Sequence, residues 1–241
     1  MIMSLFNSIN KLRLCRYQGQ SNDSRIGLVT NEDSIVDLTA LGIDRMDTLL
    51  ESNDIKDRIL KLSENKLTKI DLKDAKLLVP LEMQEVWAAG VTYSRSKKAR
   101  EIESDFSAVD FDRVYSADRP QIFFKSIAEK VVATGEPIGI RSDSNWNVPE
   151  PELVLVMNSS GKIVGYTIGN DMSSRDIEGE NILYQPQAKI YNRSCSIGPW
   201  IIIGVNEEEA RKWIISIKIK RNDKLIYQDE ISVSQIKRSF N

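Results

Sequence analysis

The sequence predicts an α+β fold in which β-strands dominate. The N-terminal part alternates short strand patterns with one helical pattern, and the remainder consists mainly of strand patterns separated by turn signals. A charged stretch, Lys66–Lys76, separates the two parts. We therefore predict a small α+β domain at residues 1–76 and a β-rich domain at residues 77–241.

The N-terminal unit contains three predicted strands and one predicted helix. Polar turn residues separate the strands, which are Lys11–Tyr17, Arg25–Thr30 and Ser34–Asp37. The helix is predicted from Ile43 to Leu62, because apolar residues recur there at helical spacing.

The second unit contains seven strand predictions. They are Val86–Gly90, Gln121–Lys125, Lys130–Ala133, Glu152–Met157, Lys162–Ile168, Trp213–Arg221 and Lys224–Ile231. The first of these is apolar throughout and is expected to be buried. Residues 158–161 and 222–223 are predicted to form the turns of two hairpins.

Two helices are predicted between these strands. The polar segment Tyr93–Glu103 has helical character, and its basic residues are typical of a solvated helix face. The segment that begins at Asp171 reads as a strand end that runs into a short helix, with Ser173 or Ser174 as its N-cap.

The composition excludes several classes of protein and of site. The net charge of −2 gives no reason to expect a nucleic-acid or membrane-surface partner, and no apolar run is long enough to cross a bilayer. The chain has no histidine, so it cannot build a Ser-His-Asp triad, a Cys-His pair or an imidazole-ligated zinc site by itself. Two cysteines are too few for a disulfide framework, and we expect a cytoplasmic protein.

Three carboxylates and one lysine are the candidate functional residues. Glu150 and Glu152 are two positions apart at a strand start, so their side chains point to the same face. Asp171 closes the next strand, and three converging carboxylates suit a hard cation such as Mg²⁺ or Mn²⁺. Each residue also has a simpler interpretation: the glutamates as solvated side chains, Asp171 as a helix cap, and Lys189 as a surface lysine.

Six motifs resemble the fumarylacetoacetate hydrolase superfamily, in their order along the chain and over residues 77 to 205. They are Arg119–Lys125, Arg141–Trp146, Pro149–Leu153, Gly165–Asp171, Ser174–Glu178 and Gln187–Tyr191. Within the superfamily the chain is most similar to the branch that dehydrates 2-keto-3-deoxy sugar acids of the 2-dehydro-3-deoxy-D-arabinonate type.

The resemblance implies a fold, an assembly and a site. The implied fold is a mixed β-sandwich or roll of mostly antiparallel strands behind a small α+β domain, and the implied assembly is a homodimer or a higher homo-oligomer. The implied metal is Mg²⁺, with Mn²⁺ as an alternative, held by Glu150, Glu152 and Asp171, and Lys189 is implied as the catalytic residue.

The chain departs from the superfamily pattern in three ways. Hydrolases of the superfamily carry a histidine after a Gly-x-x-Tyr motif, whereas the segment after Tyr93 has none, which favours the dehydratase branch. Gln121 stands where similar members have Glu, and an amide cannot act as a general base. The superfamily core continues past the last hairpin predicted here. From this we expect the sequence ending at Asn241 to lack C-terminal strands and to be weak or inactive.

The expected reaction is therefore the Mg²⁺-dependent dehydration of a 2-keto-3-deoxy sugar acid, a lyase reaction through a metal-stabilised enolate. Lys189 would move the C3 proton or steady the enolate, with a pKa lowered by burial and by the metal. Arg119, Lys125 or Tyr93 would orient this small-molecule substrate. Two alternatives remain open at this stage. One is a hydrolase, tautomerase or decarboxylase of a β-keto or enol acid, and the other is a non-catalytic remnant.

Overall fold

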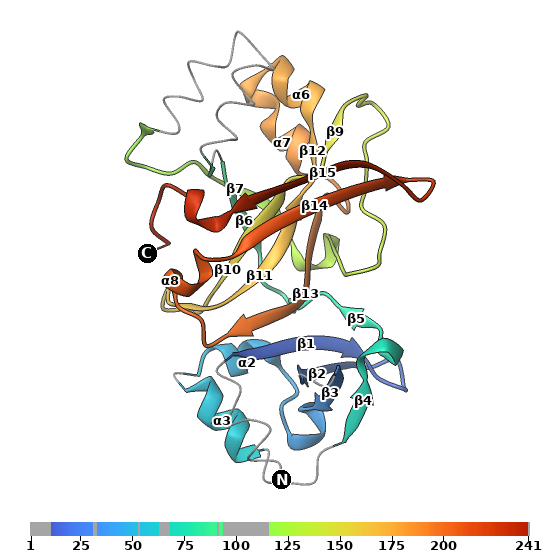
Figure 1. Cartoon of the computed structure of the whole chain (residues 1–241), viewed down its shortest axis with the longest axis vertical. Helices are drawn as coiled ribbons and strands as arrows, with labels where there is room; N and C mark the ends of the chain where they lie inside the picture. The colour runs from blue at the N-terminus through green and yellow to red at the C-terminus, as the bar shows by residue number, and fades with distance from the viewer. Residues whose placement is uncertain are drawn as a thin grey trace.

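The computed structural model describes residues 11–30, 33–52, 54–62, 68–90, 92–93 and 116–240 (Figure 1). The dominant element of this part of the chain is a sheet of nine strands in the order β10-β11-β13-β1-β2-β3-β4, with β5 beside β1 and β8 beside β13. All neighbours in this sheet are antiparallel except β8 and β13. The strands are β1 Leu12–Gln18, β2 Ser24–Val29, β3 Ser34–Asp37, β4 Lys69–Asp71, β5 Leu77–Leu78, β8 Val131–Val132, β10 Pro151–Met157, β11 Ile163–Asp171 and β13 Cys195–Ile203.

The described part of the fold also contains three strand pairs, five α-helices and five short 3-10 helices. The pairs are β6 Val86–Ala89 with β7 Ile122–Ser126, β9 Asn147–Val148 with β12 Ser173–Ser174, and β14 Ile214–Arg221 with β15 Lys224–Ser232. The helices are α2 Met46–Leu50, α3 Ile55–Leu62, α6 Arg175–Glu180, α7 Gln185–Lys189 and α8 Glu207–Ala210. Strands dominate over helices, which confirms the predicted α+β, mainly β fold. No helix in this part of the chain has both the length and the apolar character needed to cross a membrane.

The N-terminal elements lie together at one end of the molecule, at the bottom of Figure 1. Their core joins the apolar faces of α2 and α3 to β1 and β2, through residues such as Leu14, Leu28 and Leu49. The strand β13 runs down from the other end and pairs with β1. One sheet therefore contains strands from both sides of the predicted domain boundary at residue 76. The domain boundary at that residue stays a prediction.

The predicted single helix from Ile43 to Leu62 is wrong, because the structure has two short helices, α2 and α3. The polar residues between them favour turns and caps over the helix interior. Asp54 illustrates this: its side chain accepts from the backbone N–H of Asp57 at 3.3 Å. The helical spacing of the apolar residues is nevertheless kept, because Met46, Leu49 and Ile59 are all buried in one core.

The largest departures from the predicted strands concern β6 and β13. The strand β6 is only half-buried, with Trp87 58% exposed, and among the described residues it pairs only with β7. The central strand β13 is absent from the predictions. Gly198 and Pro199 interrupt its sequence, and a proline usually argues against a central strand because it has no N–H to donate.

The hairpin of β10 and β11 brings the candidate site together. Its turn is closed by a hydrogen bond from the Asn158 N–H to the Lys162 carbonyl oxygen, 3.0 Å long, and Gly161 has a positive φ of 78°. At the other end of the hairpin, the Asp171 N–H donates to the Glu150 carbonyl oxygen at 2.9 Å. The chain then enters α6 through Ser174, the predicted N-cap position. The hydroxyl of Ser174 bonds to Asn147 and not to a helix N–H.

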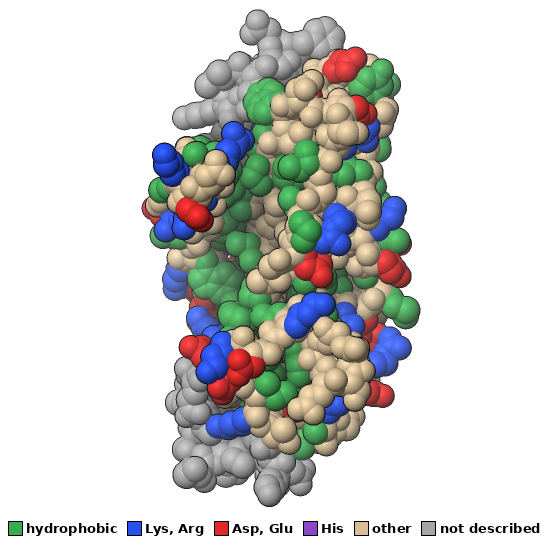
Figure 2. Space-filling model, turned by 90° about the vertical axis from the view of Figure 1, so that its right-hand side faces the viewer, with side chains coloured by type: hydrophobic (Ala, Val, Ile, Leu, Met, Phe, Trp, Pro, Cys, Tyr) green, Lys and Arg blue, Asp and Glu red, His purple; other side chains and the backbone are tan. Residues whose placement is uncertain are grey.

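The hairpin of β14 and β15 crosses the C-terminal half of the molecule (Figure 1). Its turn lies at Asn222-Asp223, as the sequence predicted, and both residues have a positive φ, which is typical of a two-residue hairpin loop. The hairpin carries several exposed apolar side chains, among them Ile214 and Leu225. On one face of the molecule hydrophobic side chains gather in a hollow (Figure 2).

Candidate functional site

A cavity of about 610 Å³ lies between the strand ends of the β10–β11 hairpin, the helices α6 and α7, and the β14–β15 hairpin. One wall is charged and contains all three carboxylates that the sequence singled out. Another part of the lining comes from β14 and β15, which contribute four isoleucines together with Tyr227, Asp229 and Glu230. The charged wall is formed by Glu150, Glu152, Asp171, Arg175, Glu178 and Lys189.

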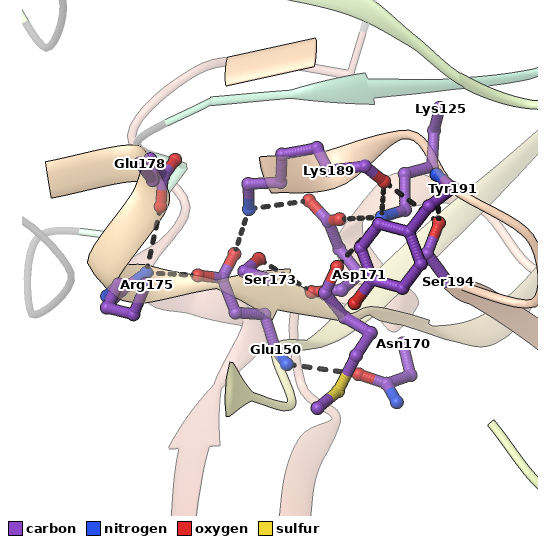
Figure 3. A network of polar contacts seen from close by, with 11 residues as sticks. Lys125, Glu150, Asn170, Asp171, Ser173, Arg175, Glu178, Lys189, Tyr191 and Ser194 are labelled. Carbon is purple, nitrogen blue, oxygen red and sulfur yellow. Dashed lines mark hydrogen bonds and ion pairs between the residues drawn. The ribbon is translucent and has the colours of Figure 1, made fainter. Parts of the chain in front are cut away.

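Lys189 lies at the centre of the charged wall (Figure 3). Its ammonium group donates to Glu150 Oε2 at 2.8 Å and to Asp171 Oδ2 at 3.0 Å, and its side chain is only 4% exposed. Burial by itself lowers the pKa of Lys189, but the charges of Glu150 and Asp171 outweigh burial and raise it. Lys189 is therefore a cation, and the depressed pKa expected from the sequence is not produced by the protein's own groups.

Arg175, the first residue of α6, holds Glu150 from the other side. Its guanidinium donates to Glu150 Oε1 at 2.5 Å and lies 3.4 Å from Glu178 Oε2 (Figure 3). The start of α6 is itself fixed, because the Arg175 N–H donates to the Trp146 carbonyl oxygen at 2.7 Å. The carboxylate of Glu150 is thus held between two cations from two helices.

Lys125 lies behind Asp171. Its ammonium group is 2.6 Å from Asp171 Oδ1 and donates to the carbonyl oxygens of Met172 and Lys189. Burial lowers the pKa of Lys125, and Asp171 opposes that effect. Lys125 does not line the cavity, so it lies outside the substrate-binding position that the sequence suggested.

Glu152 and Tyr93 form the deeper part of the same wall. Burial raises the pKa of Glu152 well above its usual value, and the charges of Glu150 and Asp171 raise it further. The Tyr93 hydroxyl lies next to the Glu152 carboxylate, and burial raises the pKa of that phenol too. Glu150 and Glu152 therefore face one cavity, as their spacing of two residues predicted.

The structure brings most of the predicted site residues together. Tyr93 and Gln121 line the cavity with the carboxylates, whereas Arg119 is exposed and is not among the lining residues. Arg175 and Glu178 were not assigned a role from the sequence, although they lie in one of the quoted motifs. Residues 94–115 fall outside the described residues, and with them all of the predicted helix Tyr93–Glu103 except Tyr93 itself.

The donor types of this wall fit a hard divalent cation, because all three predicted ligands offer carboxylate oxygens to one cavity. In this conformation no three acidic or sulfur side chains of the described residues already form a metal-binding cluster. The place between Glu150 and Asp171 is taken by the ammonium group of Lys189. A cation bound there would share two carboxylates with Lys189 or displace it.

Comparison with known protein families shows to which family the domain with this charged wall belongs. The C-terminal domain of fumarylacetoacetate (FAA) hydrolase matches residues 85–239, which is more than half of the chain. The chain belongs to the fumarylacetoacetate hydrolase family. This confirms the resemblance that the sequence motifs indicated.

Two curated relatives are similar to more than two thirds of this chain. The chain is 50% identical over 166 residues to a "Probable 2-keto-3-deoxyxylonate dehydratase" of Haloferax volcanii, covering 69% of this chain and 57% of that protein. It is 36% identical over 188 residues to the "2-dehydro-3-deoxy-D-arabinonate dehydratase" of Saccharolobus solfataricus, covering 76% of this chain and 63% of that protein. The chain thus spans less than two thirds of the length of either relative.

A solved structure of this family supports the same grouping. It is described as "2-keto-3-deoxy-D-arabinonate dehydratase complexed with magnesium and 2,5-dioxopentanoate". The two structures superpose with a TM-score of 0.72 at 29% sequence identity, covering 95% of this chain and 79% of the other. That protein therefore combines this fold with a magnesium ion and a 2-keto acid.

Proposed function

We propose that this protein is a Mg²⁺-dependent lyase that dehydrates a 2-keto-3-deoxy sugar acid. The observation that carries the proposal is the charged wall of Glu150, Glu152, Asp171 and Lys189 in a chain so similar to two proteins named as dehydratases of such acids. The solved relative bound to magnesium and 2,5-dioxopentanoate supports the same metal and ligand class.

The chemistry follows from the substrate. A 2-keto-3-deoxy pentonate loses a proton from C3 and the hydroxyl from C4 as one water molecule, which leaves a C3–C4 double bond conjugated with the keto group. A proton then moves from C5 to C3, which leaves an enol at C4–C5, and the enol hydroxyl proton moves to C4, so that C5 becomes the aldehyde of 2,5-dioxopentanoate. The loss of water and the move from C5 to C3 both need negative charge to be stabilised at the keto oxygen.

The residues of the wall divide these tasks. Glu150, Glu152 and Asp171 would hold the divalent cation. When bound, Mg²⁺ supplies Lewis-acid stabilisation of negative charge at the 2-keto oxygen. Lys189 would steady the negative charge that develops beside C3, because its ammonium group is the cation at the centre of the wall. It would take up the C3 proton only after giving up one of its own. The isoleucine side chains of β14 and β15 would limit the access of bulk water to the reacting atoms.

Substrate orientation would fall to Tyr93, which lies next to Glu152. Arg119 and Lys125 receive no such role in the proposal, since neither lines the cavity. We further propose that the protein acts on this small molecule in the cytoplasm, as a homodimer or a higher homo-oligomer.

The test is a direct assay with a defined substrate. A 2-keto-3-deoxy pentonate keeps one stereocentre, at C4, so both C4 enantiomers should be offered with Mg²⁺ and with Mn²⁺. Release of 2,5-dioxopentanoate, followed by its aldehyde signal in proton NMR, is the expected result. An acylpyruvate and oxaloacetate serve as comparison substrates. Turnover of either of these, without any aldehyde product from the pentonates, would replace the proposal with a hydrolase or a decarboxylase.

A further inference from the structure

We infer that Lys125 is a positioning residue: its buried ammonium group fixes the carboxylate of Asp171 and the end of α7, and through α7 it fixes Lys189. Only the expected effect of Lys125 on turnover rests on the proposed function. The structural core of the inference is the set of contacts that one ammonium group makes between two segments of the site.

The strand β7 explains how Lys125 reaches this place. Phe123 and Lys125 are two residues apart and therefore share a face of the strand. Phe123 lines the cavity, and the centroid of its ring is 5.9 Å from Lys189 Nζ. Lys125 is the next residue on that face and is only 2% exposed, so it lies behind the charged wall and does not line the cavity.

A buried ammonium group has three N–H donors and needs an acceptor for each. Lys125 donates to the Met172 carbonyl at 3.0 Å and to the Lys189 carbonyl at 2.5 Å, and its third contact is an ion pair with Asp171 Oδ1, 2.6 Å away. Asp171 and Met172 end one segment, and Lys189 ends the helix α7 (Figure 3). One side chain from a third element therefore ties together the two segments that carry Asp171 and Lys189.

The contact with α7 matters because that helix has only five residues. Short helices end with carbonyl groups that lack intrahelical partners. The Lys189 carbonyl accepts from Lys125 Nζ and also from Ser194 Oγ at 2.9 Å. The position from which the Lys189 side chain starts is thus fixed by two donors.

The contact with Asp171 sets the plane of its carboxylate. Oδ1 faces Lys125 and Oδ2 faces Lys189 Nζ, so each oxygen has its own cation. Without Lys125, the carboxylate would keep one of these two restraints and gain the freedom to rotate. Asp171 is a proposed cation ligand, so its orientation would affect metal affinity directly.

This inference and a purely electrostatic role predict opposite signs for metal binding. Removing a positive charge next to Asp171 should tighten the binding of a divalent cation if charge alone matters. If Lys125 sets the geometry, its removal should weaken binding. A role in general stability predicts neither change in the protein that remains folded.

The experiment compares Lys125→Met with the matched control Lys212→Met, which removes the same charge from an exposed turn just after α8. Hydrogen exchange followed by mass spectrometry is measured on the full, metal-free chain. We expect faster exchange in the segments 171–175 and 185–194 of Lys125→Met, with the N-terminal sheet unchanged. Calorimetry with Mn²⁺ should give a dissociation constant raised at least about tenfold. The control should match the wild type in both.

Lys125→Arg guards against the case in which the methionine variant does not fold. Arginine keeps the buried charge, but its planar fork cannot direct three N–H groups from one nitrogen at these three oxygens. We expect it to restore the global fold without restoring slow exchange at 185–194. The inference would be overturned if either folded variant showed wild-type exchange in that segment, or if it bound Mn²⁺ more tightly. Evenly faster exchange along the whole chain in both variants would also overturn it.

These readouts separate the inference from the proposed function. Faster exchange confined to the two segments would support positioning by Lys125 even if the wild type dehydrates no sugar acid. In that case the proposed function fails and the structural role stands. Lys125→Met could instead lose dehydration while its exchange and its Mn²⁺ affinity stay unchanged. In that case the positioning role fails and the proposed function stands.

Discussion

Replacing Lys189 with methionine tests the centre of the charged wall most directly. The change keeps much of the apolar stem and removes the ammonium group that contacts Glu150 at 2.8 Å and Asp171 at 3.0 Å. The two carboxylates would then face the cavity without the cation that they share. A divalent cation would no longer compete with this ammonium group for their oxygens.

The size of the effect follows from burial. Removing one partner of a buried ion pair costs about 3–5 kcal/mol. In the variant, Glu150 still has its ion pair with Arg175, and Asp171 still has its ion pair with Lys125. We therefore expect the free energy of unfolding to fall by the lower end of this range, about 3 kcal/mol. For a chain of this length 1 kcal/mol corresponds to about 2–4 °C, so the Tm of the metal-free protein should fall by roughly 6–12 °C.

Three measurements check this prediction, each against Lys212→Met as the exposed control. Thermal unfolding in chelator gives the fall in Tm, and Mg²⁺ should recover more of the Tm in Lys189→Met than in the wild type. Calorimetry should give a Mn²⁺ dissociation constant at least about tenfold lower. The kcat for the 2-keto-3-deoxy pentonate should fall at least about a hundredfold, as for the loss of a general acid-base group.

The reasoning would be refuted by a Lys189→Met protein with the Tm and the Mn²⁺ affinity of the control. Lys189 would then contribute no charge to the wall, and its ordinary interpretation as an incidental lysine would return. Wild-type kcat with altered stability would refute only the catalytic part.

Three further predictions concern other residues of the molecule. Glu152→Gln removes one anionic donor and should abolish stoichiometric Mg²⁺ or Mn²⁺ binding, so wild-type affinity by calorimetry would contradict its assignment as a ligand. Arg175→Met leaves Glu150 with one of its two cations and should lower the free energy of unfolding in urea by about 3 kcal/mol, and an unchanged urea midpoint would argue against this tether. Burial raises the pKa of the Cys15 and Cys195 thiols to about 12, so few thiolates exist at pH 8. Neither cysteine should react with Ellman's reagent until the protein is unfolded, and rapid labelling of the native protein would refute their burial.

The strand and turn pattern was readable from the sequence wherever local signals were strong. The alternation in the C-terminal hairpin and its Asn222-Asp223 turn reappear in β14 and β15. The helix from Ile43 to Leu62 shows where local signals fail. The apolar spacing continues through a break, and only the packing of α2 and α3 against the sheet shows that there are two helices.

The spacing of Glu150 and Glu152 determined by itself that both carboxylates share one face, because side chains alternate along a strand. The order of the motifs likewise determined the family. The sequence could not place Lys189 between Glu150 and Asp171, because that contact depends on how α7 packs against the end of β11. It could not assign Lys125 a place behind the wall for the same reason. Local periodicity fixes which way a side chain points along its own element, whereas only tertiary packing fixes what it meets.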